Sequence, residues 1–269
     1  MPAVRVAVAQ TAPVVGDVAA NLADAERHIA ALSGRADLVV FPELFTTGYR
    51  RAGLDHARLA EPIPDGSSVV RLARAAAAAG IAVGGTLLER DGSTIYDTAI
   101  LIGPDGEMVG RYRKSHLYPA ERPYFAAGES LTVLPLRDEL RVGMAICFEH
   151  AFPEIFTELA LEGANLIAIP SAVPVGYEHL LELRTRARAQ DNQLFVAAAN
   201  LVGNDGEAQW CGGSLIIDPR GDVLAAAGAD GPAVIVAAVE LDRIPAERAR
   251  EPALVNRRPE LYPHLVQRT

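Results

Sequence analysis

The sequence predicts a layered α/β fold with a mixed β-sheet, and three observations support this prediction. Apolar runs of strand length alternate with segments of helical periodicity along most of the chain. Two neighbouring strand-like runs are joined by a short turn, which adds an antiparallel pair. The chain of 269 residues is also long enough to bury a large core. We therefore expect one domain over residues 1–269.

The amino-terminal part shows the β-α-β-α alternation directly. Asp17 begins a segment with helical spacing of apolar residues, Pro42 ends a strand-like run, and Gly80 stops an Ala-rich helix. We expect, in order, a strand over 4–9, a helix over 17–31, a strand over 37–41, a helix over 66–79 and a strand over 81–85.

The middle of the chain departs from pure parallel winding. A Gly-Pro-Asp-Gly turn at 103–106 separates strand-like runs at 94–102 and 107–114, which predicts a hairpin. The alternation then resumes. We expect a strand over 140–146, a helix over 153–162, a strand over 165–170, a helix over 178–190, a strand over 194–199, and two β-rich hairpin-like runs over 213–218 and 233–241.

Charge and composition exclude several classes of protein. The formal net charge is −9, and no basic block interleaved with aromatic residues occurs, which argues against nucleic-acid binding. No apolar run approaches the ~18 residues of a membrane span. Cys147 and Cys211 are expected to be free thiols in a reducing cytoplasm, since a disulfide would consume the candidate nucleophile.

Three chemically active residues follow predicted strands. Cys147 comes after the run 140–146 and before a helix-start signal at 148–154, where a nucleophile emerges at the carboxyl end of a strand. Glu43 and Lys114 each follow an apolar run as well. We expect a carboxylate, an ammonium and a thiol to converge.

This constellation resembles the Glu-Lys-Cys set of the nitrilase superfamily, the carbon–nitrogen hydrolases, along nearly the whole chain. The resemblance implies a four-layer α-β-β-α sandwich, no cofactor, and homodimers or larger homo-oligomers. Residues 253–269 resemble a C-terminal tail that contacts a partner subunit. Matching positions include Gln10, Asp17, Asn21, Tyr96, Glu107, Gly143, Phe152-Pro153-Glu154, Asn192, Asn200, Gly212, Ser214, Pro219, Gly221 and Arg257 to Tyr262.

The resemblance and the chemistry of amide hydrolysis assign roles. Cys147 is expected to be the nucleophile, its pKa lowered by Lys114 and by the following helix. Glu43 is expected to transfer protons in both half-reactions, with a pKa raised at a partly desolvated strand end. Lys114 and the backbone N–H of Phe148 are expected to bind the oxyanion.

A second glutamate that orients the substrate is expected at Glu121, with Glu129 as the alternative. Cys147 and His150 are three residues apart, but they form an incomplete zinc set because no second Cys/His cluster occurs. His116 is expected to be a structural hydrogen-bonding residue. The sequence therefore predicts no metal site.

The expected substrate is a small neutral amide. The segment 171–177 should line the pocket mouth and contains no Arg or Lys to pair with a substrate carboxylate, although Arg122 or His150 could reach in from other loops. Substrate contacts are expected from aromatic and small residues near the thiol. These residues are Tyr49, Phe148, His150, Ala172 and Val173.

The sequence favours an amidase that forms a Cys147 thioester. Three differences from the common family pattern, Phe148, Glu149 and Thr157, leave the bond-making residues in place. Phe148-Glu149-His150 also resembles the signature of true nitrilases, so nitrile hydrolysis is an alternative, as is hydrolysis of N-carbamoyl compounds. A non-catalytic scaffold is disfavoured, because a buried carboxylate, ammonium and thiol are electrostatically demanding without a function.

Overall fold

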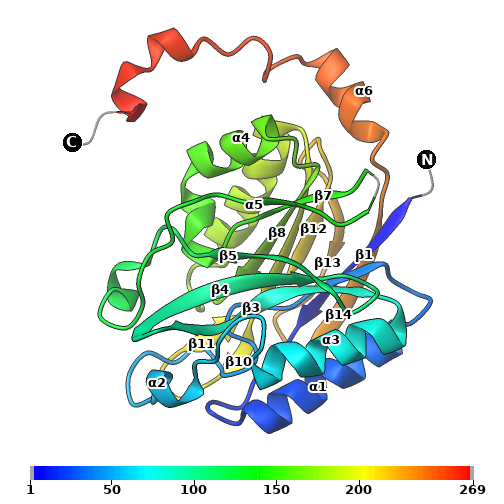
Figure 1. Ribbon diagram of the computed structural model, residues 1–269. Helices are drawn as coiled ribbons and strands as arrows, with labels where there is room; N and C mark the ends of the chain where they lie inside the picture. The colour runs from blue at the N-terminus through cyan, green and yellow to red at the C-terminus, as the bar shows by residue number, and fades with distance from the viewer. Residues whose placement is uncertain (1–2, 138, 267–269) are drawn as a thin grey trace.

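Two six-stranded sheets pack face to face in the computed structural model, which describes residues 3–137 and 139–266 (Figure 1). Helices α1 (Val18–Ala31) and α3 (Ser67–Ala79) cover the outer face of one sheet, and α4 (Pro153–Leu161) and α5 (Glu178–Asn192) cover that of the other. This is a four-layer α-β-β-α sandwich. The predicted fold class is confirmed.

The first sheet has the strand order β14-β1-β2-β3-β4-β5. Strands β1, β2 and β3 are parallel, and the other neighbours are antiparallel. The strands are β1 (Val4–Gln10), β2 (Leu38–Val40), β3 (Ala82–Asp91), β4 (Thr94–Ile102), β5 (Met108–Arg113) and β14 (Ala233–Val239).

The second sheet has the order β13-β12-β9-β8-β7-β6, with β7, β8 and β9 parallel. Its strands are β6 (Val133–Pro135), β7 (Arg141–Met144), β8 (Leu166–Ser171), β9 (Phe195–Asn200), β12 (Leu215–Ile217) and β13 (Val223–Ala226). The remaining elements connect these layers. They are α2 (His56–Leu59), the 3-10 turns η1 (Pro119–Glu121) and η2 (Cys147–Ala151), the strand pair β10 (Val202–Asn204) and β11 (Gln209–Cys211), and α6 (Arg243–Arg250), which is followed by the 3-10 turns η3 (Pro259–Leu261) and η4 (Pro263–Val266).

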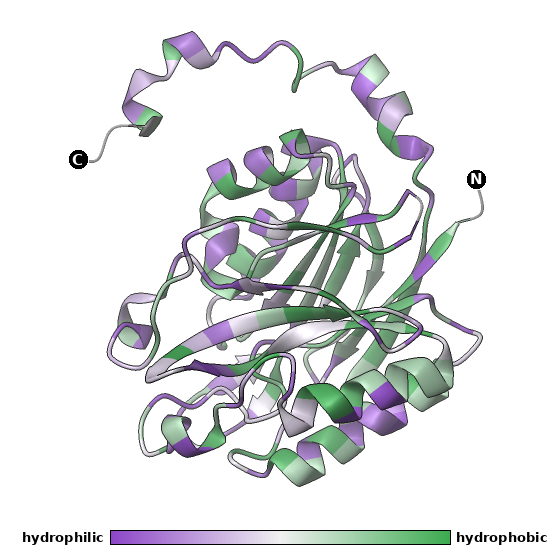
Figure 2. Ribbon diagram, viewed as in Figure 1, coloured by the Kyte–Doolittle hydropathy of each residue, from purple (hydrophilic) through white to green (hydrophobic). Residues whose placement is uncertain are grey.

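The central strands are apolar on both faces because both faces are covered. On β1, Val6 and Val8 belong to the cluster between the two sheets, whereas Ala7 and Ala9 belong to the cluster under α1 and α3. Figure 2 shows the strands coloured mostly hydrophobic while polar residues gather on the outer helices and loops. Burial on both sides explains why these strands read as continuous apolar runs rather than as alternating ones.

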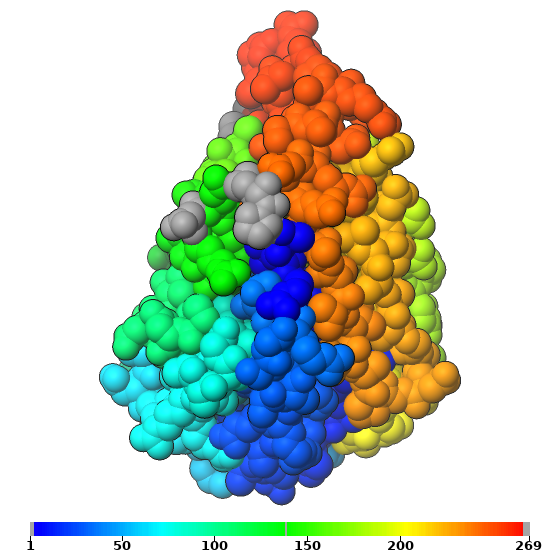
Figure 3. Space-filling view, turned by 90° about the vertical axis from the view of Figure 1, so that its right-hand side faces the viewer, coloured from blue at the N-terminus to red at the C-terminus, as the bar shows by residue number. Residues whose placement is uncertain are grey.

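Several elements differ from those expected. The run 233–241 forms no local hairpin; its strand β14 pairs antiparallel with β1 over the full length of that strand, from Val4↔Val239 to Gln10↔Ala233. Figure 3 shows these two segments, blue and orange, side by side. Strand β3 extends to Asp91, and α2, α6 and the short strands β6, β10, β11 and β13 were not predicted. Elements of three or four residues depend on their tertiary partners more than on local sequence.

The chain after α6 packs on the sandwich through Leu254 and then continues along the end of the sandwich (Figures 1 and 3). Ile244 of α6 is buried against the core, but Val255 and Leu265 are 83% and 63% exposed. Within the predicted tail, residues 267–269 lie outside the described residues. Contact of this tail with a partner subunit stays a prediction.

Two expectations concern membrane spans and the state of the cysteines. Among the described helices, none has both the length and the apolar character needed to cross a bilayer. Cys147 and Cys211 are both free thiols. The cytoplasmic location stays a prediction.

Gly85 of β3 lets two phenylalanines approach the sheet closely. A Cβ atom at this position would lie 2.7 Å from Phe45 Cε1 and 3.0 Å from Phe41 Cβ. These two rings stack with their centroids 4.7 Å apart, and they flank Glu43 in the sequence. The absence of a side chain at Gly85 therefore helps to position the turn that carries Glu43.

We predict that Gly85→Ala destabilises the protein by about 1–3 kcal/mol, because the added methyl overpacks this contact. Gly84→Ala is the matched control, since a Cβ there meets no atom closer than 3.8 Å. Urea unfolding of both variants measures the difference. Equal unfolding midpoints for the two variants would contradict the close-packing argument.

Candidate active site

Three distant segments bring Glu43, Lys114 and Cys147 to one site. Glu43 lies in the turn after β2, Lys114 comes directly after β5, and Cys147 begins η2 after β7. Lys114 Nζ lies 2.5 Å from Glu43 Oε1, and both side chains are completely buried. The backbone N–H of Glu43 donates to the Ser171 carbonyl at 3.4 Å, which joins the Glu43 turn to the end of β8 in the other sheet. The charges of Glu43 and Lys114 both act on the Cys147 thiol.

Glu121 is completely buried beside Lys114. Its Oε1 accepts hydrogen bonds from Lys114 Nζ at 2.7 Å and from the Tyr49 hydroxyl at 2.5 Å. Its Oε2 accepts from the backbone N–H of Tyr118 at 2.7 Å. Glu129, the alternative, is exposed to solvent. The structure thus places Glu121, and not Glu129, in the cluster.

Asp97 is a further buried member of this cluster that the sequence analysis missed. Its Oδ2 lies 3.8 Å from Lys114 Nζ. Neither Asp97 oxygen nor Glu43 Oε2 receives a hydrogen bond from a donor group in the described chain. Burial and the neighbouring Glu43 charge raise the pKa of Asp97 well above its ordinary value, which favours the protonated form that can donate to Glu43. The available signal was an aspartate in the middle of an apolar strand.

The Lys114 ammonium holds this cluster of carboxyl groups together. Burial alone would lower the pKa of Lys114, but the Glu43 and Glu121 carboxylates raise it well above its ordinary value, so the ammonium stays protonated. Burial raises the pKa of Glu43, as the sequence analysis expected, and Lys114 opposes this shift. An unpaired buried charge costs several kcal/mol, so these groups stabilise one another only as a set.

The same carboxyl groups have the spacing of a metal site. One oxygen from each of Glu43, Asp97 and Glu121 lies within 4.8 Å of the other two. Lys114 Nζ, however, already lies within hydrogen-bonding distance of Glu43 and Glu121. A metal ion would have to displace a buried ammonium, so the residues fit a lysine-centred charge cluster better than a metal centre.

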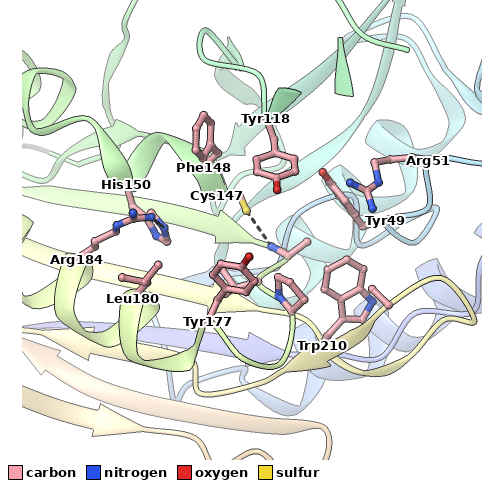
Figure 4. Close-up of a pocket in the computed structure, with 14 residues that line it drawn as sticks. Tyr49, Arg51, Tyr118, Cys147, Phe148, His150, Tyr177, Leu180, Arg184 and Trp210 are labelled. Atoms are coloured by element: carbon pink, nitrogen blue, oxygen red, sulfur yellow. Dashed lines mark hydrogen bonds between the residues drawn. The ribbon is translucent and has the colours of Figure 1, made fainter. Parts of the chain in front are cut away.

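The turn that carries Cys147 has an unusual backbone. Cys147 has φ 44° and Leu44, next to Glu43, has φ 47°. Positive φ is uncommon in residues other than glycine, and it marks a functional turn when it occurs at a site of this kind. The Cys147 Sγ atom accepts a hydrogen bond from the backbone N–H of Ala172 at 3.5 Å (Figure 4).

Lys114 lowers the pKa of Cys147, as expected, but the expected net lowering is wrong. Burial and the Glu43 carboxylate raise the pKa of the thiol well above its ordinary value, and Lys114 offsets only part of this effect. The segment after the sulfur is the 3-10 turn η2, whereas α4 begins only at Pro153.

Glu149 links the turn that carries Cys147 to the segment after Lys114 through hydrogen bonds. Its Oε2 accepts from the backbone N–H of Ile146 at 2.7 Å. Its Oε1 accepts from the Tyr112 hydroxyl at 2.6 Å and from the backbone N–H groups of Ser115 and His116 at 2.8 and 3.0 Å. Burial alone would raise the pKa of Glu149, but the side chains of His116, Tyr112 and Ser115 and the backbone N–H of Ile146 lower it below its ordinary value. The sequence analysis gave Glu149 no positioning role.

A cavity of about 270 Å³ opens beside the thiol (Figure 4). Phe148 packs edge-to-face on Tyr118, and Tyr49 packs edge-to-face on Trp210, so aromatic rings form much of the wall. All five residues expected to contact substrate line this cavity, namely Tyr49, Phe148, His150, Ala172 and Val173. The volume suits a small molecule.

Two arginines that the sequence analysis missed also line the cavity. The segment 171–177 contributes no cation, as expected, but Arg51 reaches in from the loop after β2 and Arg184 from α5. Arg122 is exposed and does not line the cavity. Leu180 and Arg184 are four residues apart and share a helix face, so the spacing was the available signal.

Comparison with known proteins identifies a family over most of the chain. A model of the family described as "Carbon-nitrogen hydrolase" matches residues 5–249. A Pseudomonas protegens protein called "Hydrolase in pqqF 5'region" is 38% identical, covering 98% of this chain and 92% of that protein. An (R)-stereoselective amidase from a Pseudomonas species is 35% identical, covering 90% of this chain and 87% of the relative.

Solved structures of amidases from this superfamily are also similar to this chain. A mutant of the Nesterenkonia AN1 amidase, from the nitrilase superfamily, superposes with a TM-score of 0.86 at 27% identity, covering 98% of both chains. Another mutant of that amidase carries the acetamide moiety of fluoroacetamide added covalently at its active-site cysteine.

We predict that iodoacetamide alkylates Cys147 slowly at neutral pH and faster at alkaline pH, because burial and Glu43 raise the thiol pKa. Glu43→Gln should shift the midpoint of this pH dependence downward, since it removes the negative charge that disfavours the thiolate. Intact-mass kinetics in a Cys211→Ala background measure the rate, with Cys147→Ala as the control. An unchanged or higher midpoint in Glu43→Gln would show that the carboxylate does not act on the sulfur.

We predict that Asp97→Asn keeps kcat/KM within about tenfold of the native value, because an amide also provides a neutral hydrogen-bond donor for Glu43. Asp97→Ala should destabilise the protein by about 1–3 kcal/mol, since it leaves Glu43 Oε2 buried without a partner. Urea unfolding and steady-state kinetics compare the two variants. If Asp97→Asn and Asp97→Ala lower the free energy of unfolding and kcat/KM equally, Asp97 acts as a charged carboxylate.

Proposed function

This chain belongs to the carbon-nitrogen hydrolase family, and we propose that it is an amidase that hydrolyses a small amide through a thioester at Cys147. The observation that carries the proposal is the buried Lys114 ammonium, 2.5 Å from Glu43 and 2.7 Å from Glu121, at a site whose charges act on a thiol beside a small cavity. Each chemical step of amide hydrolysis can then be assigned to a residue of this site.

Acylation begins with a neutral thiol and a carboxylate. Glu43 takes the proton of the Cys147 thiol while the sulfur attacks the amide carbonyl carbon, forming the C–S bond and moving an electron pair onto oxygen. Glu43 then gives this proton to the amide nitrogen. The C–N bond breaks, and ammonia or an amine leaves the thioester behind. The raised thiol pKa makes this base-assisted step necessary.

Deacylation uses the same carboxylate. Glu43 takes a proton from a water molecule that attacks the thioester carbonyl, and a C–O bond forms. The intermediate collapses with cleavage of the C–S bond, and the proton returns to the Cys147 sulfur. The carboxylic acid product leaves and the free thiol is regenerated.

Lys114 and the backbone N–H of Phe148 stabilise the oxyanion in both steps. Loss of one such donor typically costs roughly 2.7–4 kcal/mol of transition-state stabilisation. Glu121 orients this lysine, since its Oε1 accepts from Lys114 and also from Tyr49. A fixed ammonium is more effective than a mobile one because no reorganisation accompanies the reaction.

We predict that incubation with a slowly hydrolysed amide adds an acyl mass to the native chain and none to Cys147→Ala. Intact-mass spectrometry measures the adduct, and Cys211→Ala is the matched control because Cys211 is the other free thiol. An adduct that persists in Cys147→Ala would refute the assignment of the nucleophile.

A panel of three related compounds distinguishes the amidase proposal from its alternatives. Paired amide, nitrile and N-carbamoyl compounds with identical acyl groups should show the highest kcat/KM for the amide. Faster turnover of the nitrile would assign the protein as a nitrilase, and faster turnover of the carbamoyl compound would assign it to that chemistry.

A further inference from the structure

Two segments from different parts of the chain form one end of the cavity. Tyr49 and Arg51 line it from the loop after β2, and Ala208 and Trp210 line it from the hairpin of β10 and β11. Figure 4 shows Tyr49, Arg51 and Trp210 together at this end. The wall of the cavity there keeps its shape only while the loop and the hairpin stay together.

The inner part of this wall is fixed by burial. Tyr49 and Trp210 are each only 6% exposed, and their rings pack edge-to-face with the centroids 5.4 Å apart. Both rings belong to one apolar cluster. Arg51 and Ala208, in contrast, are half-buried, and Ala52 is exposed. The outer part of the wall therefore depends on a different interaction.

That interaction is made by the carboxylate of Glu207, which lies in the turn of the hairpin. Its Oε1 accepts a hydrogen bond from Arg51 Nε at 2.7 Å and lies 2.7 Å from Arg51 Nη2. Its Oε2 accepts from the backbone N–H groups of Arg51 and Ala52 at 3.0 and 3.2 Å. One side chain thus binds both the guanidinium and the backbone of the opposite loop. We call this set of contacts the Arg51–Glu207 clasp.

The two segments that the clasp joins differ in their own stiffness. In the hairpin, Asp205 Oδ1 accepts from the backbone N–H groups of Glu207 and Ala208, each at 2.8 Å, and Asp205 Oδ2 accepts from Trp210 Nε1 at 3.1 Å. In the opposite loop, Gly53 has φ 73°, a conformation that glycine enters and leaves at low cost. The hairpin is therefore the fixed side, and the loop that carries Arg51 is the side that can move.

The clasp is strong enough to favour a closed wall and exposed enough to open. The side chains of Arg51 and Glu207 are 27% and 22% exposed, so water and salt ions reach them. Ion pairs of this kind contribute little to stability and weaken as the salt concentration rises. A modest change at this position should therefore widen the outer part of the cavity without unfolding the inner part.

We propose that the Arg51–Glu207 clasp is a specificity determinant that limits substrate size, because it holds the outer wall of the cavity closed around a small amide. The closed cavity has a volume of about 270 Å³. Opening the clasp adds room beyond the buried Tyr49 and Trp210 rings, where only a longer substrate reaches. This inference rests on the proposed amidase function.

The test compares kcat/KM for propanamide and octanamide, which differ only in chain length. Glu207→Ala should raise the ratio of octanamide to propanamide about three- to tenfold, the range expected when a partly exposed ion pair is lost. Glu207→Gln should raise the ratio less, because the amide group keeps one acceptor oxygen. A merely stabilising role of Glu207 would change both substrates equally and leave the ratio as it is.

Glu26→Gln is the matched control. Glu26 binds Arg71 through two hydrogen bonds of 2.8 Å, and these side chains are 34% and 36% exposed. This pair lies on α1 and α3, which cover the outer face of the first sheet, so its loss should not change the ratio. Added potassium chloride should raise the ratio more in the native enzyme than in Glu207→Ala, since only the native enzyme has a clasp that salt can weaken.

Alkylation of Cys147 repeats the test without turnover. In a Cys211→Ala background at alkaline pH, Glu207→Ala should raise the rate of a long N-alkyl iodoacetamide relative to iodoacetamide about three- to tenfold. An unchanged or lower ratio in both assays would overturn the clasp as a specificity determinant and leave the amidase proposal standing. If no amide is hydrolysed but the alkylation ratio rises, the clasp still controls access to Cys147, and the amidase proposal alone is refuted.

Discussion

The structure of this site depends on one buried ammonium. Lys114 lies in contact with Glu43 and Glu121, and near Asp97, where water does not reach. Without the lysine, carboxyl groups this close would bind protons and lose their function as bases. With it, at least one carboxylate stays ionised in a site of low polarity. In the proposed mechanism this carboxylate is the base for the Cys147 thiol, whose pKa is raised by burial and by Glu43.

The sandwich architecture makes this cluster possible. Glu43, Asp97 and Lys114 come from the first sheet, and Cys147 comes from the second, so the site exists only where the two sheets face each other. The backbone near Glu43 and at Cys147 also has an unusual conformation. Cys147 and Leu44 adopt positive φ, a conformation that non-glycine residues hold only when their surroundings impose it. The hydrogen bonds that Glu149 accepts from both sides of the site supply part of that constraint at Cys147.

The cavity joins two environments of different charge. Near Tyr49 lie the buried Glu121 carboxyl group and the Lys114 ammonium, whereas near His150 the guanidinium of Arg184 has no carboxylate partner among the described residues. Aromatic and small apolar side chains separate these ends. A substrate held between these ends would be oriented before the reaction starts, which lowers the entropic part of the barrier.

The sequence by itself determined the alternation of strands and helices, the family resemblance, and the positions of Glu43, Lys114 and Cys147 at strand ends. These features are local, because the apolar runs and the helical spacing that predict them lie within single segments of the chain. The tertiary structure alone decided that Asp97 joins the cluster, that β14 pairs with β1, and that Arg184 reaches the cavity. It also reversed the expected pKa shift of Cys147. Burial and the distances between charges arise from segments far apart in the chain, and no pattern within one segment contains them.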